Sequence, residues 1–160
     1  MDEIDFDELV SSLEQIVGIF DEDITPYAIG LTQKLLEKFK QLMETANAVK
    51  DDEEDDGEAA LAAIGCITAV KRVISSCYKS KETLRNLEAV CLPHFIYCLT
   101  PDGIDCVEDC VESIALLLYH QDSVSPQLWE FYPLLMGVLK GDSPDGGYAY
   151  EYLSYCIPAL

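Results

Sequence analysis

Basic residues are scarce in this chain of 160 residues, which contains ten Lys and Arg against 30 Asp and Glu. The formal net charge is therefore −20. A protein that binds nucleic acid needs a basic face to neutralise the phosphates, so this scarcity excludes direct nucleic-acid binding. The excess of acid makes a basic protein the expected partner.

Long hydrophobic runs are also missing. No apolar stretch reaches the roughly 20 residues that a membrane-spanning helix needs. The first residues, MDEIDF, lack the basic and apolar regions of a secretion signal. We therefore expect a soluble, intracellular protein that makes no contact with a membrane.

The cysteines show neither CxxC spacing nor an even number, which argues against a zinc site and against a disulfide framework. We predict that they are reduced and pack in the core. Neither His94 nor His120 completes a ligand set, so no metal and no cofactor is expected. Cys91 and His94 share a helical face, but nothing nearby orients them or offers oxyanion donors, and we predict that the chain is not an enzyme. The seven cysteines are Cys66, Cys77, Cys91, Cys98, Cys106, Cys110 and Cys156.

Apolar residues recur along the chain with helical spacing, and no segment alternates as a strand does. Helix starts are signalled by Thr25 before Pro26, by Ser80, and by Ser125 before Pro126. The predicted class is all-α. The expected helices cover approximately residues 6–20, 26–46, 59–78, 80–99, 104–120, 126–140 and 148 onward.

An internal repeat gives the architecture. Residues 20–26 (FDEDITP) reappear as residues 120–126 (HQDSVSP), 100 positions later, and residues 92–99 resemble residues 132–139, which is an offset of 40. Helix pairs of about 40 residues are typical of HEAT repeats, which stack into a superhelix with a concave face. We predict a right-handed α-solenoid of about three antiparallel pairs plus the start of a fourth, with Trp129 in the core between repeats. The expected segments are a repeat at 1–47, an acidic loop at 48–58, repeats at 59–100 and 103–140, and the start of another at 148–160.

The acidic loop contains seven carboxylates within eight residues. Such a run can attract Lys- and Arg-rich segments by salt-sensitive steering, and we predict that it binds cargo. The alternative is a solvated loop without a partner. Calcium is not expected, because Gly57 follows six acids instead of lying between alternating ligands. The predicted binding residues are Asp51, Asp52, Glu53, Glu54, Asp55, Asp56 and Glu58.

The second half of the chain is also predicted to present an acidic surface. Residues 86–139 contain no Lys or Arg. Their eight acidic residues are Glu88, Asp102, Asp105, Glu108, Asp109, Glu112, Asp122 and Glu130.

Four stretches together resemble a known family. They are Ile24–Leu36 with the acidic loop that follows, Ala62–Ile67, Leu87–Cys91 and Val124–Glu130. In this order they are similar to the C-terminal half of importin-β-like nuclear transport receptors, the karyopherins, and most of all to the importin seven and importin eight branch. The resemblance spans essentially all 160 residues.

The resemblance implies a receptor that shuttles between cytoplasm and nucleus through the nuclear pore and contacts nucleoporins. Cargo loading and release would be governed by Ran-GTP, bound through other parts of the full-length receptor. It further implies basic cargo such as ribosomal proteins and histones, which agrees with the acidic composition. A static HEAT-repeat scaffold of a multiprotein complex is the alternative, and it predicts no preference for basic proteins.

Overall fold

The structure is a computed structural model that describes Ser12, residues 24–49 and residues 57–140. Within these residues the chain forms five α-helices and two short 3-10 helices and contains no strand, which confirms the predicted all-α class. The helix expected from 148 onward, most of the one expected at 6–20, and the acidic run from Asp51 to Asp56 lie outside the described residues.

The first described helix begins with a tight turn. A 3-10 helix, η1 (Thr25–Tyr27), leads directly into α2 (Ala28–Val49). Pro26 lies in this first turn, where its missing N–H costs no helical hydrogen bond. The predicted cap at Thr25 is wrong, because Ile24 occupies the N-cap position and no side chain caps the turn.

Helix α3 (Glu58–Ser76) starts from Gly57, whose φ of 74° lies in the left-handed region that glycine adopts without strain. Buried residues occur on more than one side of α3 because it packs against both α2 and α5. Its length and composition alone would also suit a membrane span, a property shared by core helices of soluble proteins. Small side chains such as Ala63 and Cys66 let its neighbours approach closely.

Helix α4 (Lys81–Tyr97) is capped as predicted, since the Thr83 amide donates to the Ser80 hydroxyl over 3.3 Å. A sharp turn then leads through η2 (Ile104–Cys106) to α5 (Val107–His120). Gly103 is required in this turn, because a Cβ atom there would lie 2.5 Å from the Tyr97 carbonyl oxygen.

Helix α6 (Pro126–Lys140) also begins as the sequence predicts. The Leu128 amide donates to the Ser125 hydroxyl over 3.0 Å, which satisfies one of the free N–H groups of the first turn. The prediction for Trp129 is wrong. Its side chain is 60% exposed and meets Tyr132 edge-on instead of packing between repeats.

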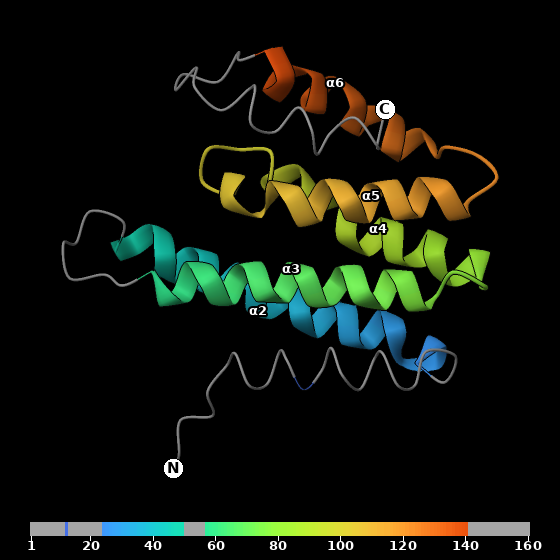
Figure 1. The fold of residues 1–160 in the computed structure, drawn as a ribbon, viewed down its shortest axis with the longest axis horizontal. Coiled ribbons are helices and arrows are strands. Elements are labelled where there is room, and N and C mark those ends of the chain that lie inside the picture. Colours follow the sequence, from blue (N-terminus) through green and yellow to red (C-terminus); the bar gives the residue numbers. More distant parts are fainter. Residues whose placement is uncertain (1–11, 13–23, 50–56, 141–160) are drawn as a thin grey trace.

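The described helices run alternately back and forth and form two layers (Figure 1). Helices α3 and α5 pack side by side in one layer, and α4 in the other layer packs against both α2 and α6. Within each layer a helix therefore contacts the second helix after it in the chain, as α2 contacts α4 and α3 contacts α5.

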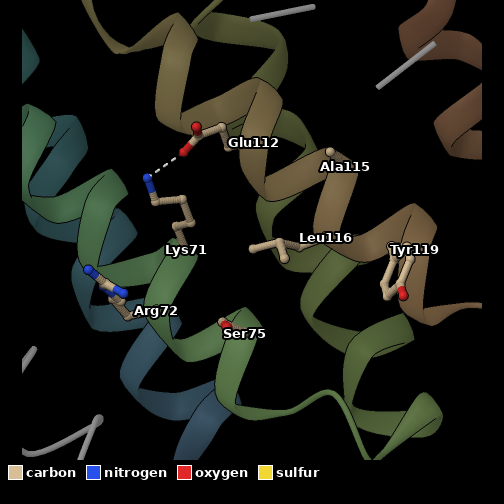
Figure 2. A pocket seen from close by; sticks show the side chains of 7 residues that line it. All are labelled: Lys71, Arg72, Ser75, Glu112, Ala115, Leu116 and Tyr119. Atoms are coloured by element: carbon tan, nitrogen blue, oxygen red, sulfur yellow. Dashed lines mark hydrogen bonds and ion pairs between the residues drawn. The ribbon is translucent and has the colours of Figure 1, made fainter. Parts of the chain in front are cut away.

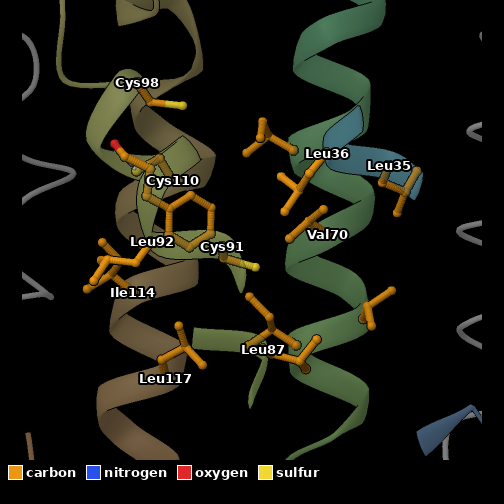
Figure 3. Packing of buried hydrophobic residues seen from close by; sticks show 14 of the residues in the cluster. Leu35, Leu36, Val70, Leu87, Cys91, Leu92, Cys98, Cys110, Ile114 and Leu117 are labelled. Atoms are coloured by element: carbon orange, nitrogen blue, oxygen red, sulfur yellow. Dashed lines mark hydrogen bonds between the residues drawn. The ribbon is translucent and has the colours of Figure 1, made fainter. Parts of the chain in front are cut away.

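One hydrophobic core runs through the stack from Ile24 to Leu135. Figure 3 shows Val70 of α3 and Leu87 and Cys91 of α4 directed into the space that α5 also lines. Phe39 and Phe95 are almost completely buried, and burying each contributes roughly 1.5–3 kcal/mol relative to exposing it.

Candidate functional site

The predicted cargo-binding run lies between α2 and α3. Of its seven residues only Glu58 is described, and it is the exposed first residue of α3. A carboxylate at this position is favoured by the positive end of the helix dipole. Asp51, Asp52, Glu53, Glu54, Asp55 and Asp56 lie outside the described residues, so their role stays a prediction.

Further acidic side chains occupy the same end of the molecule. Helices α3 and α5 both start at the end where α2 stops (Figure 1). Asp105 in η2 and Glu108 at the start of α5 are both exposed there. The helix starts that carry Glu58, Asp105 and Glu108 therefore lie at the same end of the stack as the end of α2.

The predicted acidic surface of the second half is not uniform, and Glu88 is the clearest exception. Glu88 is only 5% exposed to solvent. Gln121 donates to one of its carboxylate oxygens over 2.8 Å, and the Ser125 hydroxyl donates to the other. Glu88 therefore joins α4 to the segment that starts α6 instead of facing a partner.

Asp109 and Glu112 are likewise engaged within the fold. The Lys71 ammonium of α3 pairs with Asp109 and, over 2.7 Å, with Glu112 of α5, while the Thr68 hydroxyl donates to Asp109. Partial burial disfavours the charged form of Lys71, but its hydrogen bonds to Asp109 and Glu112 and their negative charges outweigh this and raise its pKa. This cluster, Thr68–Lys71–Asp109–Glu112, links the two helices of the α3–α5 layer.

Asp122 forms an outer link of the same kind. The Lys81 ammonium donates to Asp122 over 2.6 Å, and Arg85 donates to the Ser123 hydroxyl over 3.4 Å. The hydrogen bond and charge of Lys81 lower the pKa of the Asp122 carboxyl. Four of the eight acids therefore serve contacts between helices, and the sequence alone did not distinguish them from exposed ones.

Sequence reasoning missed two hollows. Each lies between two helices that are neighbours in the same layer. One is a groove between α3 and α5 (Figure 2), and the other is a smaller pocket between α2 and α4. Each is made by two helices from different parts of the chain, so no local sequence signal could have indicated it. The pocket between α2 and α4 is lined by Phe39, Lys40, Met43, Glu44, Asn47, Pro93, His94 and Tyr97.

Cys91 and His94, the pair considered as a nucleophile and a base, both have shifted pKa values. Burial raises the pKa of Cys91 to about 12 and lowers the pKa of His94, so the two groups are held neutral. Residues 24–49 and 57–140 contain no group of three potential metal ligands. Cys106 and Cys110, which share a helical face, are buried as predicted.

Comparison with curated proteins decides the relationship. The chain is 35% identical over 139 residues to the importin beta-like SAD2 homolog of Arabidopsis thaliana, an alignment that covers 87% of this chain and 13% of the relative. It is 23% identical over 160 residues to a probable importin-7 homolog of Dictyostelium discoideum (97% of this chain, 15% of the relative). It is 22% identical over 158 residues to importin-8 of Homo sapiens (99% and 14%).

Its homologues are importin-β-like proteins. The resemblance predicted from the four sequence stretches is thereby confirmed. The chain spans only 13–15% of the length of these importin relatives. No protein-family model matches it, and no solved structure does.

Importin homology also accounts for the two-layered stack. Importins of this kind are HEAT-repeat solenoids, and the described helices pack in that manner, which confirms the predicted fold type. The repeat boundaries at 47, 59, 100 and 103 remain predictions. The importin relatives align along 87–99% of the chain.

Proposed function

We propose that this chain is a cargo-carrying segment of a Ran-regulated nuclear import receptor and that it binds basic proteins through its acidic surfaces. The observation that carries the proposal is the homology to importins along 87–99% of the chain. The chain performs no chemistry in this role. The full-length receptor would move between cytoplasm and nucleus through the nuclear pore, with nucleoporins and Ran-GTP bound by other parts.

The charge of the chain supports a basic cargo. Its net charge of −20 produces a field that attracts Lys- and Arg-rich segments. Glu58, Asp105 and Glu108 are exposed carboxylates at the end of the molecule where α3 and α5 begin. Basic ribosomal proteins and histones are the cargo class that fits this field.

The first experiment measures binding of this chain to histone H1 by fluorescence anisotropy at increasing salt. Replacing Asp51–Asp56 and Glu58 by Asn and Gln removes seven charges, which changes the net charge from −20 to −13. A matched control replaces seven acids of the N-terminal stretch, which leaves the same net charge. These are Asp2, Glu3, Asp5, Asp7, Glu8, Glu14 and Asp21.

We expect the loop variant to bind at least tenfold more weakly than the control, with a shallower salt dependence, because local charge steers the cargo more than total charge does. If histone binding weakens equally in the two variants, the loop has no specific role in binding. Absence of histone binding by the wild-type chain would contradict cargo binding by this segment.

A second experiment uses the full-length receptor and tests regulation. Ran-GTP should release the basic cargo from the receptor, while Ran-GDP should not. If cargo stays bound in the presence of Ran-GTP, the static scaffold becomes the better description of the protein.

A further inference from the structure

The segment of residues 121–125 joins α5 to α6 and lies along one face of α4. Three side chains of α4 contact it, and they are three or four residues apart, which places them on the same side of the helix. The contacts are Lys81 with Asp122, Arg85 with Ser123, and Glu88 with both Gln121 and Ser125. Through them the segment forms a joint between α4 and the start of α6.

The Ser125 hydroxyl has two roles in this joint. It donates to the carboxylate of Glu88, which is buried. It also accepts a hydrogen bond from the Leu128 amide and so caps α6. The first role needs the hydroxyl proton, because an ionised carboxylate only accepts hydrogen bonds. A group that replaces this proton therefore breaks the bond to Glu88.

The chain around Ser125 is accessible. Residues 122–124 and 126–127 on either side of it are exposed, and residues 121–125 belong to no helix. Serine followed by proline, as Ser125 is by Pro126, is the sequence that proline-directed protein kinases modify. Because the segment makes no helical hydrogen bonds of its own, it can enter the active site of a kinase without the unfolding of a helix.

A phosphate on Ser125 would repel its present partner. A phosphoserine carries about −1.5 to −2 charges at pH 7, and Glu88 has little contact with water that could screen the repulsion. Arg85 lies on the same face of α4, one turn before Glu88, and bonds Ser123. A phosphate that turns toward Arg85 has to leave Glu88 and the first turn of α6, so this path also opens the joint.

The contact with Glu88 distinguishes Ser125 from another serine or threonine that precedes a proline. The Thr100 hydroxyl donates over 2.7 Å to the Tyr97 carbonyl oxygen of its own turn. A phosphate on Thr100 would remove a local bond, whereas a phosphate on Ser125 removes a bond between two helices. The remaining positions of this kind are Thr25 and Ser143.

We propose that Ser125 is the target of a proline-directed kinase and that its phosphate opens the joint between α4 and α6. The Ser125 oxygen attacks the γ-phosphorus of ATP, the bond from this phosphorus to the β–γ bridging oxygen breaks, and ADP leaves. The hydroxyl proton goes to the catalytic base of the kinase. Repulsion then separates Ser125 from Glu88, and α6 loses its link to α4. The inference does not depend on the cargo binding proposed above.

The first test treats the folded chain with a mitogen-activated protein kinase, ATP and Mg²⁺, and locates the phosphate by mass spectrometry. A synthetic peptide of residues 119–131 is the reference substrate. We expect phosphate on Ser125 in the chain and in the peptide. Phosphorylation of the peptide but not of Ser125 in the chain would overturn the proposal, and so would absence of phosphate from both.

Hydrogen exchange of the α6 backbone amides measures whether the joint opens. Ser125→Asp retains a capping residue but places a negative charge against Glu88. We expect the α6 amides to exchange about tenfold faster in Ser125→Asp and in the phosphorylated chain than in the wild type. Ser80→Asp is the matched control, because Ser80 caps α4 in the same way and bonds the Thr83 hydroxyl. It should leave exchange in α6 unchanged.

Combining Ser125→Asp with Glu88→Gln separates charge repulsion from a general loss of structure. The amide that Glu88→Gln introduces can donate to the new carboxylate, so exchange in α6 should return to within about twofold of Glu88→Gln alone. Unchanged α6 exchange in the phosphorylated chain would overturn the proposal. Faster exchange in Ser125→Asp that Glu88→Gln does not reverse would overturn it as well, because Glu88 would then not be the group that the phosphate repels.

Discussion

His94 shows how burial changes the pKa of a single side chain. Its ring meets Phe39 of α2 edge-on, with ring centroids 6.4 Å apart. Burial lowers the pKa of His94, and the positive charge of Lys40 acts in the same direction, while a backbone hydrogen bond to Val90 opposes them. The folded chain therefore resists protonation of this imidazole.

This shift predicts a loss of stability in mild acid. The folded pKa of His94 lies below its ordinary value of 6.5, so the unfolded chain binds the proton first as the pH falls through that value. The free energy of unfolding should decrease between pH 7.5 and 5.5, and the contribution of His94 should be less than about 1 kcal/mol because the side chain is only partly buried. Urea unfolding at both pH values checks this. A His94→Gln variant that loses as much stability as the wild type would contradict the assignment.

Glu88 shows what the sequence could not reveal at this scale. As one of eight acids in a region without Lys or Arg, it looked like part of a surface. Only the packed structure brings Gln121 and Ser125 to its two oxygens, 33 and 37 residues further along the chain. Such long-range pairs leave no local pattern, whereas the Ser80 and Ser125 caps act within three residues and were predicted correctly.

At the scale of helices, two ion pairs provide a matched comparison. Lys71 and Asp109 join α3 to α5, with side chains 20% and 14% exposed. Lys81 and Asp122 join α4 to the segment before α6, with side chains 57% and 74% exposed. The two pairs have the same chemistry and differ mainly in contact with water.

Lys71→Met should destabilise the chain by about 1–3 kcal/mol, because it leaves the Asp109 carboxylate poorly solvated beside the Thr68 hydroxyl that donates to it. Lys81→Met should destabilise the chain less than Lys71→Met does, since water and salt already screen the pair of Lys81 and Asp122. Urea unfolding at one pH measures both changes. Equal losses, or a larger loss for Lys81→Met, would show that burial does not determine the strength of these contacts.

Helical periodicity and stop signals predicted the existence, order and approximate ends of the described helices. The departures at the helix ends have local causes. Pro26 lies within a 3-10 turn instead of starting an α-helix. Helix α4 ends at Tyr97, two residues before the predicted end, where the turn to Gly103 begins. The exposure of Trp129 depends on neighbours of α6 in the stack, which its hydrophobic pattern does not specify.

At the scale of the whole molecule, a single core connects all described helices. Repeat proteins of this kind gain stability from each repeat and from the interfaces between neighbours, so opening of one repeat weakens the next. The buried cysteines are spread over the core from α3 to α5 and can report on this coupling. They are Cys66, Cys77, Cys91, Cys98, Cys106 and Cys110.

These six thiols should react together and slowly in the folded chain. Burial raises the pKa of Cys66 and of Cys91 to about 12, so almost no thiolate is present at pH 8. In a Cys156→Ser chain, which removes the cysteine outside the described residues, labelling with Ellman's reagent should be at least about 100-fold slower than in guanidinium. Mass spectrometry resolves the sites. Early labelling confined to the cysteines of one helix would show that the helices open independently.

The links between neighbouring helices have a consequence for how such a chain can lengthen. Lys71 with Glu112 and Lys81 with Asp122 each span 41 residues, close to one repeat of the sequence. A gene duplication that copies two successive units therefore copies both partners of each ion pair in register, and the new units fit their neighbours at once. Loss of a single residue between the partners would instead turn one of them by about 100° around its helix. Inheritance of whole units is thus the route by which this architecture can grow without rebuilding its contacts.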